Sequence, residues 1–576
     1  MKSPKKPASA DKNENIRHSL AHLLAAAVRA LYPGAMNAIG PAIENGFYQD
    51  FELHKPISQD DLPKIEAKMR ELLPMWTKWT KKVVTLKDVK KEFSWNRYKM
   101  ELAKEFARDK KILTFYTCGG LIDLCKGGHA FALSEIDPES FKLDRVAGAY
   151  WRGDEKNKML TRIYGLAFEN KKELERYLWQ QEEAKKRDHR KLGKELDLFS
   201  FHEEAPGFVF WHPKGMLLRE ALMSVHNKLH KDAGYQTVST PILLSEELWR
   251  RSGHWDNYKD KMYFTKIDKR TFAIKPMNCP GTILLYKEHP RSWRNFPLRL
   301  AEAGEVHRHE PSGTLHGLFR VRAFRQDDAH IFVREEQVEE EIKNVVALTL
   351  KFYELIGFKE VEVELSTRPE KYIGSLAVWT KAESTLAKVL KDLNVKFKLN
   401  RGDGAFYGPK IDFHIKDSAS RLWQCGTIQL DFFMPKRFEL EYTDKDGLKK
   451  RPIMIHRTVI GSIQRFTGII IEHFKGAFPF WLAPVQTAVL TINEKVADYA
   501  EKVFEELKKK DIRAELDLRN ESISKKIREA ELQKIPYLLI IGEKEAAAGK
   551  VAVRERGNGD TGQKTLEEFL ALTKRQ

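Results

Sequence analysis

The chain has 576 residues and a net charge of +18, and it is too long for a single core, since domains usually hold about 100–200 residues. Its content of 42% hydrophobic and 32% charged residues is typical of a globular protein and excludes a disordered one. Four cysteines do not make a disulfide framework at this length, and no apolar run reaches the ~18 residues of a membrane helix, so we expect a cytoplasmic protein. The positive net charge suits a polyanionic partner, and the alternative is a solvated basic surface.

Residues 1–14 are rich in Lys, Ser and Asp and are predicted to be disordered, and a helix is expected over residues 15–31. In the stretch "HSLAH", His18 and His22 lie four residues apart and therefore share one helix face. The later stretch "DLCKGGH" repeats that spacing with Cys125 and His129. The four residue types are typical of a structural zinc site, and the alternative is four unrelated packed side chains.

The remaining chain divides by composition. Residues 171–196 are highly charged and predict one long linker helix, and residues 197–481 form the largest block. From residue 482 onward strands alternate with helices, which indicates a small α/β domain around a mostly parallel sheet. The stretch "GNGDTGQKT" (557–565) resembles a phosphate-binding loop, but its Lys stands one place late, so we expect a hairpin turn.

Three stretches within residues 197–481 contain candidate functional residues. "RHEPSGTLHGLFRVRAFRQDDAH" (308–330) predicts two strands joined by a loop, with arginines along them whose planar guanidinium groups suit phosphate oxygens. "HRTVIGSIQRF" (456–466) places Arg465 four residues after Gly461, and "YQTVSTPILLS" (235–245) predicts a strand that ends at Pro241.

These stretches resemble motifs two, three and one of class II aminoacyl-tRNA synthetases. "KPMNCPG", "LSTRPEKYIGS", "AFYGPKIDF", "WQCGTIQLDF" and "AGAYWRGD" are similar to the threonyl-tRNA synthetase family specifically, in order and over nearly all of the chain after residue 15. The resemblance implies an α+β editing domain (15–170), a linker helix (171–196), a class II catalytic domain with an antiparallel sheet (197–481) and an α/β anticodon-binding domain (482–576). Only 17 residues precede His18, so the TGS domain that often begins this family is expected to be absent.

The resemblance also implies an activity and its residues. The expected reaction is ATP-dependent ligation of L-threonine to tRNA(Thr) through threonyl-adenylate, in a homodimer, with Mg²⁺ accompanying ATP and one Zn²⁺ per subunit. The implied zinc ligands are Cys279, His330 and His456. The implied amino-acid pocket is Gln326, Asp328, Tyr407 and Gln429. Arg308, Arg465 and Arg320 are expected to contact phosphates, and Lys410 the adenylate.

A site that requires the threonine hydroxyl rejects valine by ~10⁴-fold or more, but serine lacks only a methyl, which is worth ~10–200-fold. The resemblance therefore implies a second site that hydrolyses seryl-tRNA(Thr), and it assigns His18, His22, Lys99, Asp123, Cys125 and His129 to it. Bacterial-type members imply water activated by these side chains, whereas alanyl-type relatives hold zinc with the same set. Asn520, Glu545 and Arg554 are the candidates for reading anticodon bases in a splayed loop.

The sequence leaves two other interpretations to compare with this one. A seryl- or prolyl-type ligase is disfavoured by the set Cys279, His330 and His456. A synthetase-like RNA-binding protein that does not charge tRNA has no need of Arg308 and Arg465, so their presence argues against it.

Overall fold

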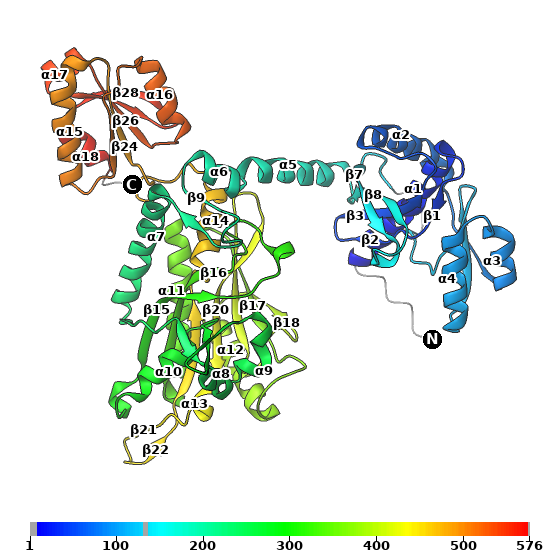
Figure 1. The fold of residues 1–576 in the computed structure, drawn as a ribbon, viewed down its shortest axis with the longest axis horizontal. Coiled ribbons are helices and arrows are strands. Elements are labelled where there is room, and N and C mark those ends of the chain that lie inside the picture. The colour runs from blue at the N-terminus through cyan, green and yellow to red at the C-terminus, as the bar shows by residue number, and fades with distance from the viewer. Residues whose placement is uncertain (1–8, 131–135, 574–576) are drawn as a thin grey trace. The chain divides into compact units, whose positions relative to one another are not determined.

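The computed structural model describes residues 9–130 and 136–573, and it divides the chain into two compact units, Met1–Glu182 and Glu183–Gln576 (Figure 1). In the described part of the chain, none of the helices combines the length and the apolar character that a membrane crossing requires.

The first unit is built around α1 (Ser9–Leu31), whose apolar side chains at helical spacing are buried, among them Leu20, Leu24 and Val28. The helix begins at Ser9, six residues before the expected start, because Ala, Lys and Glu in this stretch are good helix formers. Residues 1–8 of the segment predicted to be disordered lie outside the described residues. The helix contacts β3 of an antiparallel sheet with the order β1–β3–β8–β7, in which β2 also pairs with β3.

The strands of this sheet are β1 (Met36–Asn37), β2 (Ala42–Ile43), β3 (Gly46–Glu52), β7 (Phe141–Tyr150) and β8 (Met159–Ala167). A second antiparallel sheet comprises β4 (Thr80–Val84), β5 (Leu113–Cys118) and β6 (Leu121–Leu124). The helices that follow α1 are α2 (Leu62–Leu72), α3 (Leu86–Phe93) and α4 (Arg97–Arg108). This mixture of helices and antiparallel sheets confirms the predicted α+β class.

The linker differs from the single helix predicted over residues 171–196. It consists of α5 (Lys171–Arg187) and α6 (His189–Glu195), separated by Asp188. Asp188 leaves the helical conformation (φ −48°, ψ 117°), and its side chain accepts a hydrogen bond from the Arg190 backbone N–H. A short acidic side chain that satisfies the first amides of a helix favours such a break.

An eight-stranded sheet with the order β11–β15–β16–β23–β20–β19–β17–β18 dominates the second unit. Its pairs are antiparallel except β11–β15 and β17–β18, which confirms the antiparallel sheet expected for a class II catalytic domain. The strands are β11 (Gln236–Thr237), β15 (Leu298–His307), β16 (Ala323–Val333), β17 (Val361–Ser366), β18 (Phe397–Asn400), β19 (Lys410–Lys416), β20 (Leu422–Asp431) and β23 (Ile453–Thr458). Arg308 and Arg320 were predicted to lie on strands, but both lie in the loop 308–322 between β15 and β16.

Helices pack on this sheet and share one apolar core with it, as Phe352, Leu386 and Ile411 illustrate. The longer helices are α7 (Pro213–Asp232), α10 (Cys279–Lys287), α11 (Val338–Ile356), α12 (Leu376–Asp392) and α14 (Ile463–His473). The short elements are α8 (Glu246–Ser252), α9 (His254–Tyr258), α13 (Met434–Arg437), β9 (Phe199–Ser200), β10 (Phe210–Trp211), β12 (Leu243–Ser245), β13 (Tyr263–Ile267), β14 (Arg270–Ile274), β21 (Tyr442–Thr443) and β22 (Lys449–Lys450).

The C-terminal sheet has the order β25–β24–β26–β27–β28. Its strands are β24 (Thr487–Thr491), β25 (Ala514–Asp517), β26 (Tyr537–Ile541), β27 (Val551–Glu555) and β28 (Gly559–Lys564), and its helices are α15 (Ala497–Lys509), α16 (Ile523–Leu532), α17 (Glu543–Ala548) and α18 (Leu566–Thr573). The mostly parallel sheet expected here is in fact mixed, since β27 and β28 are antiparallel. The connection from β26 to β27 is shorter than the dozen or so residues that a parallel crossover needs. The hairpin turn predicted within 557–565 is confirmed by β27–β28.

Gly215 in α7 gives a test of this packing. Alanine normally stabilises a helix relative to glycine, but a Cβ at Gly215 would lie 1.9 Å from the carbonyl oxygen of Leu198. We expect Gly215→Ala to destabilise the protein by about 1–3 kcal/mol and to lower its thermal unfolding temperature, measured by calorimetry. Gly313→Ala is the control, because nothing lies within 4 Å of that position. Equal unfolding temperatures for the two variants would contradict this packing.

Candidate functional site

Three side chains of metal-binding type meet in the second unit. His330 on β16 lies directly opposite His456 on β23 in the antiparallel register, and the two rings are 5.0 Å apart. Cys279 is the first residue of α10, and its sulfur completes a group whose potential ligand atoms all lie within 4.8 Å of one another. Residues 51 and 126 positions apart in the sequence are thus brought to one point.

The surroundings of these side chains fit a metal. His456 Nε2 lies 2.9 Å from Asp431 Oδ2, the kind of carboxylate contact that orients a ligating imidazole. His330 Nδ1 is buried and has no hydrogen-bond partner among the described residues. Burial raises the pKa of the Cys279 thiol well above its usual range and lowers that of His330 well below. Two imidazoles and a thiol are a donor set that suits Zn²⁺.

A cavity of about 380 Å³ adjoins this group. The predicted residues that line it are Arg308, Gln326, Asp328, Tyr407 and Gln429. The Tyr407 hydroxyl donates a hydrogen bond to Gln429 Oε1, and burial raises the pKa of Asp328 to about 6. A carboxylate, two amides and a phenol beside a metal-type group can recognise a small polar ligand in several directions.

Three further predicted residues do not line this cavity. Arg320 pairs with Glu310 at 2.8 Å, and Lys410 lies 3.0 Å from both Asp403 and Asp412. Arg465 lies on α14 with its guanidinium 5.9 Å from the Trp423 ring, and its Nε is buried without a hydrogen-bond partner among the described residues. The structure therefore supports a direct contact with the cavity for Arg308 but not for these three.

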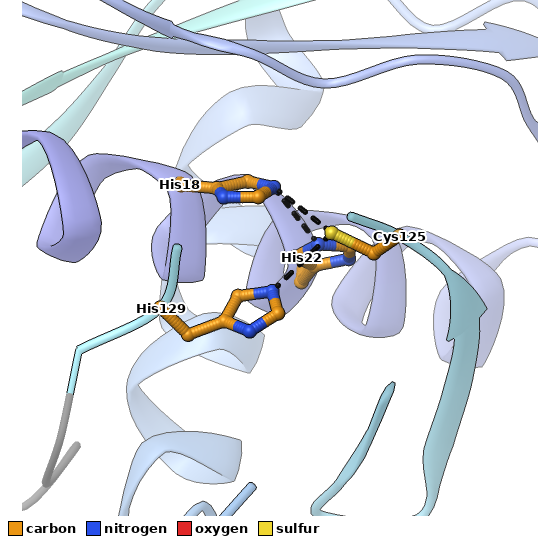
Figure 2. Close-up of side chains that lie close together, drawn as sticks. All are labelled: His18, His22, Cys125 and His129. Atoms are coloured by element: carbon orange, nitrogen blue, oxygen red, sulfur yellow. Dashed lines mark hydrogen bonds between the residues drawn. The ribbon is translucent and has the colours of Figure 1, made fainter. Parts of the chain in front are cut away.

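The second cluster lies in the first unit and joins His18 and His22 of α1 to Cys125 and His129 (Figure 2). His18 Nε2 is 3.2 Å from His22 Nε2 and 3.4 Å from Cys125 Sγ, and His129 Nε2 is 3.5 Å from the same sulfur. The backbone N–H of Gly127 also donates to that sulfur, at 3.3 Å. The expected juxtaposition of the two spaced pairs is present.

Behind the cluster, Asp123 is a buried carboxylate with three side-chain partners, and the backbone N–H of Leu124 also donates to it at 2.9 Å. Lys99 Nζ lies 2.6 Å from Oδ1, while His22 Nδ1 at 3.0 Å and Asn37 Nδ2 at 3.2 Å contact Oδ2. Burial alone would lower the pKa of His22, but its contacts with Asp123 and Cys125 outweigh burial and raise it to about 9. His22 is therefore held as an imidazolium at neutral pH.

The positive charge of His22 acts on the sulfur. Burial alone would raise the pKa of Cys125, but its contacts with His129, His18 and His22 outweigh burial and lower it to about 3. His129 is stacked on Trp79 with ring centroids 3.9 Å apart, and burial lowers its pKa. The cluster thus places a thiolate beside a neutral imidazole, which is able to accept a proton from water.

Comparison with family models places three regions. Residues 263–474 match the tRNA synthetase class II core domain (G, H, P, S and T), and residues 486–576 match an anticodon-binding domain. Residues 113–164 match the threonyl and alanyl tRNA synthetase second additional domain, which includes Cys125 and His129.

Whole-chain comparison is decisive. A threonine–tRNA ligase of Clostridium tetani is 55% identical over 562 residues, which cover 97% of this chain and 87% of the relative. The chain belongs to the threonine–tRNA ligase family. A ligase of Caldanaerobacter subterraneus subsp. tengcongensis is also 55% identical, over 96% of this chain and 86% of its own length. The RNA-binding domain of threonyl-tRNA synthetase from Cryptosporidium parvum matches with a TM-score of 0.65 and 41% identity, over 67% of this chain and 98% of that one.

Threonine–tRNA ligase motifs did not reveal every residue at the two clusters. Trp79 and Asn37 reach the first-unit cluster from segments that carry no sequence signal. Tyr258 and Met277 line the cavity, and buried His254 lies 2.9 Å from the Met277 sulfur. Met277 stands two residues before Cys279 in the family motif "KPMNCPG", and this position is the one sequence feature that indicated its place near the cavity.

The anticodon candidates lie in the domain that matches the anticodon-binding model. Asn520 is exposed in the turn after β25, and Arg554 on β27 pairs with Glu531 at 3.0 Å. Glu545 on α17 accepts hydrogen bonds from the Gly542 backbone N–H and from Gln563 Nε2. Their role in reading bases stays a prediction.

Cys125 gives a test of the electrostatics. After removal of metal with a chelator, iodoacetamide should modify Cys125 first, at a rate that is flat between about pH 5 and 8, because its thiolate is lost only as the pH falls toward about 3. Cys118 is the internal control, because burial raises its pKa to about 11. Its thiolate fraction, and therefore its own rate of modification, should rise about tenfold with each unit of increasing pH over the same range. Mass spectrometry of each peptide measures both rates. A Cys125 rate that climbs in parallel with that of Cys118 would contradict the assignment.

Proposed function

We propose that this chain ligates L-threonine to tRNA(Thr) in two steps through threonyl-adenylate, with ATP and Mg²⁺, and that its N-terminal unit hydrolyses seryl-tRNA(Thr). The observation that carries the proposal is the convergence of Cys279, His330 and His456 on one cavity in a chain of this family. The domain matched by the threonyl and alanyl model supports the second activity.

The donor set supports one Zn²⁺ held by Cys279, His330 and His456. When bound, the ion would offer an open coordination position to the amine and hydroxyl of threonine. Asp328 lines the same cavity and is held by Asn278 Nδ2 at 3.2 Å, so its carboxylate is oriented to accept the substrate amine. A site that requires a hydroxyl disfavours valine, which lacks one.

Activation requires cations where charge develops on phosphate and carboxylate oxygens. Arg308 lines the cavity, and its Nε donates to the Pro276 carbonyl at 3.2 Å, which orients the rest of the guanidinium. This supports a contact of Arg308 with the α-phosphate and the attacking carboxylate. Arg465 does not line the cavity and its Nε is buried, so its contact with the γ-phosphate stays a prediction. For Arg320 and Lys410, which pair with carboxylates, contacts with the phosphates and the adenylate stay predictions.

The histidine cluster is the proposed hydrolytic site. A neutral His129 is able to accept a proton from a water molecule that attacks the seryl ester, and the Cys125 thiolate lies beside it, with its sulfur 3.5 Å from His129 Nε2. Asp123 and Lys99 act behind them by holding His22 in place. The same four donors are also a set that zinc would accept, and removal of metal distinguishes the two mechanisms.

The partners follow from the reaction. tRNA(Thr), ATP and threonine are substrates, and the anticodon-binding domain and the net charge of +18 suit a polyanionic substrate. A homodimer is proposed from class II membership. A cytoplasmic location is proposed because tRNA charging serves translation.

The zinc assignment is tested with Cys279→Ala. We expect the metal content, measured by mass spectrometry, to fall by one Zn²⁺ per chain and aminoacylation of tRNA(Thr) to fall by at least about 10²-fold, because two ligands no longer hold the ion. Cys118→Ala, at a buried cysteine of the first unit, is the matched control and should change neither. Unchanged zinc content with normal charging in Cys279→Ala would refute the assignment.

The editing assignment is tested with His22→Ala. Loss of a group that positions proton transfer typically costs ~10²–10⁴-fold, so deacylation of preformed seryl-tRNA(Thr) should fall by about that factor while threonine charging stays within about twofold. His54→Ala, at an exposed histidine of the same unit, is the control. If His22→Ala clears seryl-tRNA(Thr) at the wild-type rate, the cluster is not the hydrolytic site. Deacylation that survives chelation supports activated water, and its loss supports zinc.

A further inference from the structure

One buried histidine of the linker contacts both motif two and motif three of the catalytic core. His189, the first residue of α6, is fully buried. Its Nδ1 lies 2.7 Å from Glu472 Oε1 on α14, the helix that carries Arg465. Its Nε2 accepts a hydrogen bond from the backbone N–H of Leu318, at 2.9 Å, in the loop that carries Arg308 and Arg320.

These contacts require a neutral histidine with its proton on Nδ1. The Leu318 amide can only donate, so Nε2 must be the acceptor, and Nδ1 is then the donor to the Glu472 carboxylate. The His189 backbone N–H donates to the same carboxylate oxygen, at 3.1 Å. One side chain therefore joins the start of α6, the loop 308–322 and α14.

The loop is shaped to receive this ring. Gly317 has φ +48°, and a Cβ there would lie 2.2 Å from His189 Nε2, so no larger residue fits without displacing the ring. Phe319 packs on the ring with centroids 4.1 Å apart. Phe319 and Arg320 both donate their backbone N–H groups to the His316 carbonyl, so Leu318 lies at the tip of a tight turn.

The turn is connected to the arginine at the cavity. Arg320 follows the tip and pairs with Glu310, and the backbone N–H of Glu310 donates to the carbonyl of Arg308 at 2.9 Å. A cavity of about 640 Å³ lies between α6 and the other side of the loop, bordered by Leu315 and Gly317. Leu318 is itself fully buried in the core of the second unit, and Phe319 packs on Trp423 with ring centroids 4.4 Å apart. The bond from Leu318 to His189 therefore acts together with apolar contacts at the tip of the loop.

We propose that His189 is a positioning residue that holds the Arg308–Arg320 loop in the conformation that accepts ATP. It touches no substrate and acts through Leu318. The inference rests on the proposed function, since the loop matters for ATP only if the chain makes an adenylate. A loop that is only partly in the competent conformation weakens the apparent affinity for ATP by that fraction.

Two substitutions separate the contacts of His189. Asparagine reproduces the position of Nδ1 and can still donate to Glu472, but it cannot reach Leu318. Glutamine reproduces the position of Nε2 and can still accept from Leu318, but it loses Glu472. His189→Asn and His189→Gln each remove one bond and part of a buried ring, so they are matched for general loss of stability.

Threonine-dependent ATP–pyrophosphate exchange on the full chain measures the consequence. We expect His189→Asn to raise KM for ATP by about threefold or more, with kcat and KM for threonine within about twofold of wild type, and His189→Gln to keep KM for ATP within about twofold. A merely structural defect would lower kcat in both variants and leave the ratio of the two KM values unchanged. Equal KM values for ATP in the two variants would overturn the inference.

Hydrogen exchange at the Leu318 amide gives a readout that does not depend on activity. The amide should stay protected in wild type and His189→Gln and should exchange at least about tenfold faster in His189→Asn. Equal protection in the two variants would overturn the inference. An absence of exchange between ATP and pyrophosphate in wild type would refute the proposed function, while the amide comparison would still decide whether His189 holds the loop.

Discussion

The register between β16 and β23 is the constraint on which the catalytic site depends. His330 and His456 are direct partners in this antiparallel pair, and Gln429 is the partner of His456 on the next strand. Side chains alternate between the faces of a sheet, so a slip by one residue would carry His330 to the opposite face and destroy the metal-type group. Gln326 and Asp328 precede His330 at intervals of two and therefore lie on the same face, toward the cavity. The eight-stranded sheet and its core fix the positions of these side chains on the face toward the cavity.

The two clusters use similar residues under opposite electrostatics. At Cys279, burial dominates and raises the thiol pKa, and the positive charge of Arg308 lowers it by less than burial raises it. A bound cation fits the remaining deficit of positive charge. At Cys125, the charged His22, itself held by Asp123, supplies positive charge and lowers the pKa of the thiol. Because of this difference, the cluster of Cys279, His330 and His456 suits a resident metal. The cluster of His18, His22, Cys125 and His129 is able to transfer protons with protein groups alone.

Much of this architecture was predictable from the sequence, because local patterns and family motifs act together. The spacing of His18 and His22 placed both on one helix face, and the order of the motifs gave the class II fold. The resemblance grouped Cys279 with His330 and His456, although their spacing could not. The break at Asp188, the stacking of Trp79 on His129 and the mixed C-terminal sheet were not predicted, because each depends on tertiary contacts or connection geometry. The role of His189 was hidden for the same reason, since its partners lie 129 and 283 residues away.

In the proposed function, amino-acid selection at the Cys279 cavity depends on a hydroxyl, and a second site discriminates against serine, which lacks only the methyl group of threonine. The most direct test is ATP–pyrophosphate exchange on the purified chain with threonine, serine and valine in turn. We expect exchange with threonine, exchange with serine that is weaker by ~10–200-fold, and exchange with valine that is reduced by ~10⁴-fold or more. Exchange with valine that equals or exceeds exchange with serine would contradict this proposal.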